Sequence, residues 1–308
     1  MTCWQPLFIC DLVSTGAVCA KKESEMVSRR EAQRLWEEVF SQMLETRARK
    51  YQYFLAGLAF GIRILLPQRK RADIFRCVYA SLRRADDVAD GDIPNPPPHN
   101  TAPEFIERLI SFVEIGGTTP EDNAEKLLSY AFMLAKEENI DISGCVRKIL
   151  DSLLFDARRR NPVLQVFPAR TLDEYFHRMD IEGTIEMCLL LTEENRRSVA
   201  HAHLSDLGKA TRIYYTLRDL KEDTTAGLCN ISQEDIHTFG ISDVRDNSSK
   251  GILAWQRLQA QKGLRLLRQH RACMRWPPLI EMNLRTKAVL WFVYEAPAGR
   301  YFRTILRS

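Results

Sequence analysis

The sequence has no pair of cysteines at the Cys-x-x-Cys spacing, and no uninterrupted apolar run of the roughly 20 residues that a transmembrane helix needs. Its eight cysteines are scattered over 308 residues, which favours reduced, mostly buried thiols over a zinc site or a disulfide framework. The short apolar stretch near the amino terminus is interrupted by Asp11 and follows no basic residue, so we interpret residues 1–27 as a tail rather than a signal peptide. These absences predict a cytoplasmic protein whose contact with membranes is at most peripheral.

No low-complexity linker divides the rest of the chain, so we expect one large domain over residues 28–308. The net charge of +4 is small; it gives no indication of a nucleic-acid partner, so we predict none, and it suits a ligand that carries phosphate. No glycine fingerprint for a dinucleotide is present, although a reductive step with NADPH is left open. Strand-like alternation of apolar and polar residues is scarce, and helix signals recur instead.

Three of these signals mark helix starts. Ser28 and Glu31 have the spacing of a capping box ahead of a run with helical apolar spacing. Thr119-Pro120 predicts the start of a second helix with proline at its first position. Residues 171–174 have the form of another capping box, which would open a helix containing Tyr175. The sequence therefore predicts an all-α single domain.

Two segments rich in aspartate lie within the predicted helices. Asp86 and Asp90 are four residues apart, as are Asp219 and Asp223, and this step places two side chains on one helical face. Carboxylates this close repel each other unless a cation lies between them. Mg2+ prefers oxygen ligands and commonly joins one or two protein carboxylates to the phosphates of a substrate. If the two segments face each other, they would form a site for Mg2+ and a diphosphate.

Two simpler explanations compete with that site, because acidic residues at helical spacing often form a solvated surface or an ion-pair network. The neighbouring residues are mostly apolar or small, and buried carboxylates need cations or hydrogen bonds. Arg83, Arg84, Arg212 and Arg218 could supply those partners. Since arginine is also the best bidentate ligand for phosphate, the same residues suit a diphosphate site, which is the interpretation we favour.

Both aspartate segments resemble the substrate-binding regions of the squalene/phytoene synthase family. The first resemblance consists of Leu65-Leu66-Pro67, a basic segment, Tyr79, and Arg83 ahead of Asp86-Asp87. The second runs over residues 207–223 and resembles the second aspartate region of that family. The order, the separation and the chain length agree, and the resemblance extends from residue 30 to the end.

The resemblance implies an all-α isoprenoid synthase fold whose central cavity holds a prenyl diphosphate of the farnesyl or geranylgeranyl type, in a monomer or a homodimer. Tyr175 matches a tyrosine thought to steer the cation or the proton in the family, and with Asp86, Asp90, Asp219 and Asp223 it forms the predicted catalytic set. The predicted Mg2+ ligands are Asp86, Asp87, Asp90, Asp219, Glu222 and Asp223. The residues predicted around the diphosphate are Arg83, Arg84, Arg212, Arg218, Tyr215 and Tyr301.

The chain departs from the family pattern at several positions. Asp180 and Glu182 stand where the family has small apolar residues, and Arg212 and Tyr215 replace a glutamine and an asparagine. Residues 227–232 replace the segment that forms a flap in the family. Because carboxylates against a hydrocarbon tail are costly, we expect at least one of the two prenyl tail sites to be rebuilt unless these carboxylates turn outward.

These departures leave the ionisation machinery intact and leave the acceptor open. Head-to-head coupling with a second prenyl diphosphate is the default for the family. In the main alternative, one prenyl diphosphate is cyclised or transferred to an aromatic or indole-like acceptor, with Asp180, Glu182 or His177 as a base. An alternative of another class is a catalytically inactive assembly or scaffold protein, and the retained acidic clusters argue against it. Prenyl chain length depends on the depth of the cavity, which the sequence does not give.

Overall fold

In a computed structural model of the chain, the described residues are 27–45, 62–66, 68–116, 119–194, 203–275 and 280–307. These ranges contain helices and no strand, so the predicted all-α fold is confirmed. Most of the predicted tail lies outside the described residues. The elements are α2 (Arg29–Glu45), η1 (Ile62–Ile64), α4 (Arg69–Asp90), α5 (Ala102–Glu114), α6 (Asn123–Glu137), α7 (Ser143–Arg159), α8 (Ala169–His177), η2 (Arg178–Ile185), α9 (Glu186–Leu191), α11 (Ser205–Thr225), α12 (Gln233–Thr238), α13 (Lys250–Cys273), α15 (Leu284–Val289), η3 (Leu290–Glu295) and α16 (Ala296–Arg307).

The helix starts follow capping chemistry, with two corrections to the predictions. The Ser28 hydroxyl accepts a hydrogen bond from the Glu31 amide at 3.2 Å, as predicted. The helix predicted to start at Thr119-Pro120 is α6, and it begins at Asn123. The Asp122 carboxylate caps it by accepting a hydrogen bond from a backbone amide. The helix that contains Tyr175 begins at Ala169, so the predicted capping box at 171–174 lies within the helix and not ahead of it.

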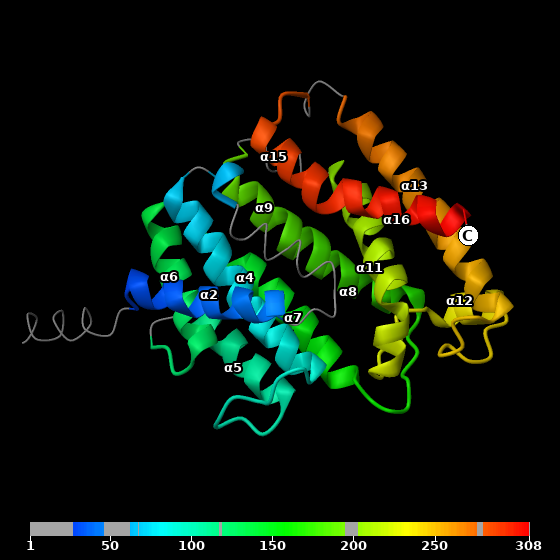
Figure 1. Cartoon of the computed structure of the whole chain (residues 1–308), viewed down its shortest axis with the longest axis horizontal. Helices are drawn as coiled ribbons and strands as arrows, with labels where there is room; N and C mark the ends of the chain where they lie inside the picture. The colour runs from blue at the N-terminus through cyan, green and yellow to red at the C-terminus, as the bar shows by residue number, and fades with distance from the viewer. Residues whose placement is uncertain are drawn as a thin grey trace, which may run out of the picture.

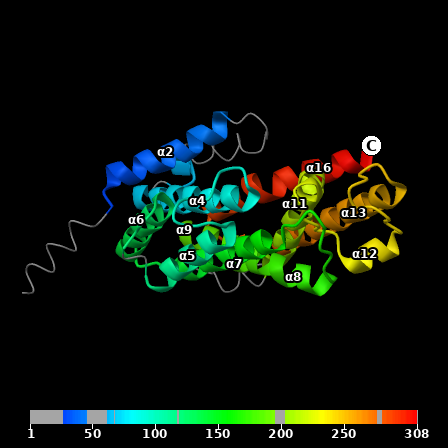
Figure 2. The ribbon, with the colours of Figure 1, turned by 90° about the horizontal axis from the view of Figure 1, so that it is seen from below.

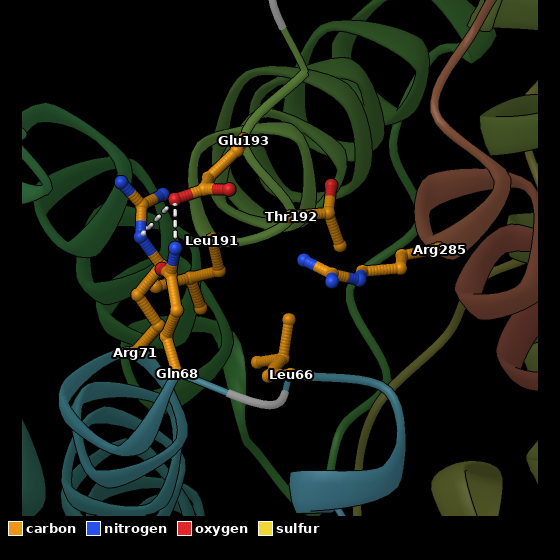
Figure 3. Close-up of a pocket in the computed structure, with 7 residues that line it drawn as sticks. All are labelled: Leu66, Gln68, Arg71, Leu191, Thr192, Glu193 and Arg285. Carbon is orange, nitrogen blue, oxygen red and sulfur yellow. Dashed lines mark hydrogen bonds and ion pairs between the residues drawn. The ribbon is translucent and has the colours of Figure 1, made fainter.

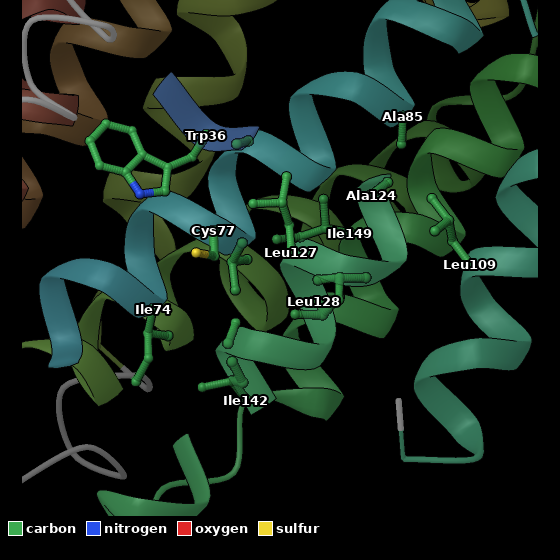
Figure 4. Packing of buried hydrophobic residues seen from close by; sticks show 14 of the residues in the cluster. Trp36, Ile74, Cys77, Ala85, Leu109, Ala124, Leu127, Leu128, Ile142 and Ile149 are labelled. Carbon is green, nitrogen blue, oxygen red and sulfur yellow. The ribbon is translucent and has the colours of Figure 1, made fainter. Parts of the chain in front are cut away.

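The apolar faces of the helices bury two hydrophobic cores. The first gathers α2, α4, α5, α6 and α7, which group around α4 in Figure 1. Figure 4 shows its interior, to which Ile74 and Cys77 of α4 and Leu127 and Leu128 of α6 all contribute side chains. The second core gathers α11, α13 and α16. In Figure 2, α2 and α4 lie on one side of the molecule and α5 and α7 on the other.

Two π-helical segments, η2 and η3, continue directly from α-helices on their amino-terminal sides. Within η2, the Thr184 hydroxyl donates to the Met179 carbonyl five residues earlier, at 2.8 Å. A π-helical turn changes which side chains face a given direction, and such turns are frequent at functional sites. η2 also packs closely on α11, since a Cβ atom added at Gly208 would lie 1.9 Å from Cδ1 of Ile181. A larger residue at position 208 would force the Ile181 side chain of η2 to move.

The amino-terminal end of α4 is held by a cluster of charged residues. Arg71 lies within 3.2 Å of the Glu138 carboxylate and 3.5 Å of the Glu193 carboxylate, and Gln68 also donates to Glu193. Figure 3 shows this cluster beside a small hollow that Arg285 completes. The hollow has a volume of about 10 Å³, which is room for about one water molecule. We therefore regard this hollow as part of the scaffold that fixes α4.

Among the described helices, none is long and apolar enough to cross a membrane.

Candidate active site

One cavity of about 450 Å³ is lined by residues of both hydrophobic cores. Along α4 its lining changes from Phe75 and Val78 to Asp86 and Asp90, over roughly 20 Å at 1.5 Å per residue. Arg160 connects the carboxyl-terminal ends of α4 and α11, because its guanidinium donates to Asp90 and to the Ala226 carbonyl. The cavity is therefore apolar at one end and acidic at the other.

The first acidic cluster lies in the last turns of α4. Gly91 adopts a φ of +75° and ends this helix, which is a backbone conformation that glycine adopts most readily. Arg83 donates to the Asp86 carboxylate at 2.8 Å and also to Asp87. Burial raises the pKa of Asp87 to about 6, and burial together with the nearby Asp86 carboxylate raises the pKa of Asp90. Asp86 and Asp90 line the cavity, whereas Asp87 lies outside the lining and accepts a hydrogen bond from Arg83.

The second acidic cluster lies in the last turns of α11, and Asp219, Glu222 and Asp223 all line the cavity. The Asp219 carboxylate accepts two hydrogen bonds from the guanidinium of Arg218, at 2.6 and 2.5 Å. The Asp223 carboxylate accepts from the amide group of Asn230 at 2.9 Å. Burial, followed by the charge of Asp219, raises the pKa of Asp223 to about 7. As in the first cluster, burial and a neighbouring carboxylate together raise a carboxyl pKa in this site.

A hydrogen-bonded network joins the second cluster to Tyr175. The Tyr175 hydroxyl donates to Asp156, and Arg159 donates to the same carboxylate at 2.8 Å. Arg159 also donates to the Asn230 side-chain carbonyl at 2.6 Å, and Asn230 in turn holds Asp223. Burial raises the pKa of Tyr175 well above its usual value, so the hydroxyl carries its proton. The structure thus links the predicted tyrosine to the predicted metal-binding carboxylate through Arg159 and Asn230.

Sequence reasoning missed Arg159, Arg160 and Asn230. The two arginines follow Asp156 in a basic run that had the ordinary appearance of a helix end, and α7 does end there. Asn230 belongs to the segment that differs from the family flap, and its neighbour Leu228 also lines the cavity. The sequence signal that could have identified Asn230 is the position of this segment, which directly follows the second acidic cluster.

The substituted residues of η2 face in different directions. Asp180 lines the cavity and accepts from Arg212 of α11, with distances of 2.7 Å to Nε and 2.9 Å to Nη2. Glu182 lies outside the cavity lining and pairs with Lys148 at 2.6 Å, with His177 3.6 Å away. Burial raises the pKa of Asp180, while the Arg212 charge opposes that shift. Asp180 and Arg212, which both depart from the family pattern, thus form one ion pair in the wall of the cavity.

The remaining predicted residues surround the α11 side of the site. Tyr215 lines the cavity, with its ring 4.9 Å from the Arg218 guanidinium. Tyr301 donates to the Leu217 carbonyl at 3.1 Å and is not part of the cavity lining. Arg84 is also outside that lining. Its Nε atom, like the Nε of Arg83, is buried with no hydrogen-bond partner in the described parts of the chain.

The donor set fits Mg2+ held jointly with a substrate better than a preformed metal centre. Among the described residues, no three His, Cys, Asp or Glu side chains form a group that could hold a metal ion by themselves. Mg2+ commonly takes one or two protein carboxylates together with waters and substrate phosphates. Asp86, Asp90, Asp219, Glu222 and Asp223 supply oxygen atoms from two opposing helices, so a diphosphate could complete the coordination.

Comparison with known proteins agrees with this geometry. The sequence model of the squalene/phytoene synthase family matches residues 61–305. This range contains both acidic clusters, the Tyr175 network and the Asp180–Arg212 pair. A search of curated proteins found no match to the chain. Because the matched range covers most of the sequence, the chain belongs to the squalene/phytoene synthase family.

Proposed function

We propose that this protein ionises an allylic prenyl diphosphate, of the farnesyl or geranylgeranyl type, in a Mg2+-dependent reaction. Membership of the family indicates prenyltransferase-type isoprenoid synthase activity. The observation that carries the proposal is the placement of two acidic clusters, from α4 and α11, at one end of a cavity whose other end is apolar. A diphosphate suits the acidic end when metal is present, and a prenyl chain suits the apolar end.

The residues divide the chemistry between them. Asp86 and Asp90 on one side, and Asp219, Glu222 and Asp223 on the other, would hold Mg2+. When bound, Mg2+ neutralises the charge that develops on the departing diphosphate. Arg83 lines the acidic end of the cavity and has a buried Nε donor without a partner among the described residues, which suits it to bind diphosphate oxygens. Arg84 lies outside the lining. We assign Arg218 and Tyr215, which line the cavity, to the α11 side of the same diphosphate site. Tyr301 lies outside the lining and contacts α11 through the Leu217 carbonyl.

The first step breaks the bond between the allylic carbon and the diphosphate oxygen, and the diphosphate leaves with the electron pair. The apolar lining then protects the allylic cation from water. Tyr175 faces this cavity as a protonated hydroxyl, which suits a role in steering the cation. Family precedent favours coupling with a second prenyl diphosphate, and the alternative is a reaction of one prenyl diphosphate alone or with a different acceptor.

Diphosphate release from farnesyl and geranylgeranyl diphosphate, measured with Mg2+ and with EDTA, tests the proposal. We expect release only with Mg2+, and we expect Asp86→Ala and Asp219→Ala to abolish it. Asp151→Ala is a matched control, because Asp151 pairs with Arg147 on α7 and lies outside the cavity lining. Full release by either cluster variant would refute the metal assignment, and absence of release from the wild-type protein would favour a scaffold role.

A further inference from the structure

We propose that Arg159 is a positioning residue that holds two functional groups of the site at once. It fixes the Tyr175 hydroxyl through Asp156. It fixes the Asp223 carboxylate through Asn230. The inference rests on the proposed function, because it takes Asp223 as a ligand of Mg2+ and Tyr175 as a group that faces the substrate.

The Arg159 guanidinium is buried, and all of its nitrogen atoms donate hydrogen bonds. Arg159 is the last residue of α7, and its side chain is 3% exposed. Nε donates to the Asp156 carboxylate at 2.8 Å, Nη1 to the Cys229 carbonyl at 2.9 Å and Nη2 to Oδ1 of Asn230 at 2.6 Å. A guanidinium offers its donors in a rigid planar fork, so these partners keep one arrangement relative to each other. Since Arg159 lies outside the cavity lining, it acts on the site through them.

On the tyrosine side, Arg159 holds both the hydroxyl and the ring. Asp156 accepts from Arg159 on Oδ1 and from the Tyr175 hydroxyl on Oδ2, so this carboxylate joins the two residues directly. The Arg159 guanidinium also lies 5.4 Å from the centroid of the Tyr175 ring. Because the hydroxyl donates its one proton to Asp156, its oxygen offers lone pairs to any other group. Tyr175 lines the cavity, and this arrangement suits an oxygen that stabilises an allylic cation.

On the metal side, Arg159 determines which way the Asn230 amide points. A guanidinium donates hydrogen bonds and accepts none, so the amide presents its oxygen to Arg159 and its NH2 group to Asp223. That NH2 group donates to Oδ2 of the Asp223 carboxylate at 2.9 Å. Removing a partner that orients a metal ligand in this way typically lowers metal affinity by about 10- to 100-fold. Arg159 therefore reaches a proposed Mg2+ ligand of α11 from the end of α7.

The segment that carries Asn230 packs closely against the chain that follows α7. Gly227 has a φ of +89°, and a Cβ atom added there would lie 2.4 Å from the Asn161 carbonyl oxygen. The Asn161 amide in turn donates to the Gly227 carbonyl at 3.4 Å. Asn161 lies two residues after Arg159 in the chain. The contact therefore holds Asn230, three residues after Gly227, beside the Arg159 guanidinium.

Two measurements on the full chain separate the two sides of Arg159. Calorimetry gives the Mg2+ concentration for half-maximal binding of inorganic diphosphate. The 13Cζ resonance of Tyr175, assigned by its loss in Tyr175→Phe, reports on the hydroxyl. In Asn230→Ala, the Mg2+ concentration should rise about tenfold while the resonance stays in place. In Arg159→Lys, the Mg2+ concentration should rise by a similar factor and the resonance should also move, because an ammonium group lacks the planar fork that holds both sides.

The matched control is Arg147→Lys, which changes an arginine of the same helix that pairs with Asp151 outside the cavity lining. It should alter neither measurement. The double variant Arg159→Lys/Asn230→Ala should need no more Mg2+ than Asn230→Ala, because both changes act through the one hydrogen bond to Asp223.

Three results would each overturn the proposal. They are an unchanged Mg2+ concentration in Asn230→Ala, an unmoved resonance in Arg159→Lys, and factors that multiply in the double variant. If circular dichroism shows that Arg159→Lys does not fold, the Asn230→Ala result decides. Neither measurement needs turnover, and the Tyr175 resonance needs no ligand. The role of Arg159 is therefore decided even if the protein releases no diphosphate and the proposed function fails.

Discussion

Replacing Arg212 alone with methionine should destabilise the protein strongly. The substitution keeps an apolar stem of similar length but leaves the Asp180 carboxylate, which is 9% exposed, without the guanidinium that donates two hydrogen bonds to it. Breaking a buried ion pair by removing one partner typically costs about 3 to 5 kcal/mol. For a chain of this length, that corresponds to a fall in Tm of about 5 to 8 °C.

Urea unfolding followed by circular dichroism measures this loss. Adding Asp180→Leu to Arg212→Met should recover most of the stability, because replacing both charges with apolar groups is often neutral or stabilising. Lys148→Met provides the control, since the pair it breaks is partly exposed and should cost less than about 1 kcal/mol. Equal losses in Arg212→Met and Lys148→Met would refute the description of Asp180–Arg212 as a desolvated pair.

The loss in Arg212→Met should also depend on pH. Burial raises the pKa of Asp180, and the Arg212 charge is the main influence that opposes this, so removing Arg212 raises that pKa further. A carboxyl group whose pKa is higher in the folded state stabilises the fold at low pH and loses this contribution as the pH rises. The stability deficit of Arg212→Met should therefore be smaller at pH 5 than at pH 7.5. A deficit that grows toward pH 5 would contradict the assignment.

Three further predictions concern other parts of the molecule. Asn230→Ala removes the hydrogen bond to Asp223, so the Mg2+ concentration for half-maximal diphosphate release should rise by about tenfold. Gly208→Ala should cost about 1 to 3 kcal/mol in urea unfolding, whereas Gly144→Ala, whose added Cβ would meet nothing within 4 Å, should be neutral or stabilise slightly. Burial lowers the pKa of His270, so as the pH falls the unfolded chain binds a proton at this residue before the folded chain does. The free energy of unfolding should therefore decrease below about pH 6.5. The urea midpoint of His270→Leu, measured against pH, should show a flatter profile than that of the wild-type protein.

Local sequence signals were sufficient for the helical architecture and for the acidic clusters. Four-residue spacing within apolar helices placed Asp86 with Asp90, and Asp219 with Asp223, and all four line one cavity. Helical geometry also accounts for the ion pair between Asp156 and Arg159, which lie three residues apart on α7. These features depend on residues near one another in the chain, where helical geometry fixes which side chains meet.

Long-range partners could not be read in the same way. Asp180 and Arg212 each stand out in the sequence as a departure from the family pattern. Their separation of 32 positions does not indicate that they are partners. The direction of Glu182 was equally undetermined, because the π-helical turn of η2 changes the relation between spacing and face. Pairing between helices is decided by how closely they pack, and that is a property of the folded chain.

The close approach of η2 to α11 ties several positions together in descent. Gly208 lies one helical turn before Arg212, and Ile181, which occupies the space beside Gly208, follows Asp180 directly. A lineage that exchanged Asp180 or Arg212 alone would produce a chain with a lone buried charge, and selection would act against it. Asp180 and Arg212 should therefore be gained or lost together among homologous sequences, which would make the pair a heritable marker of this form of the contact between η2 and α11.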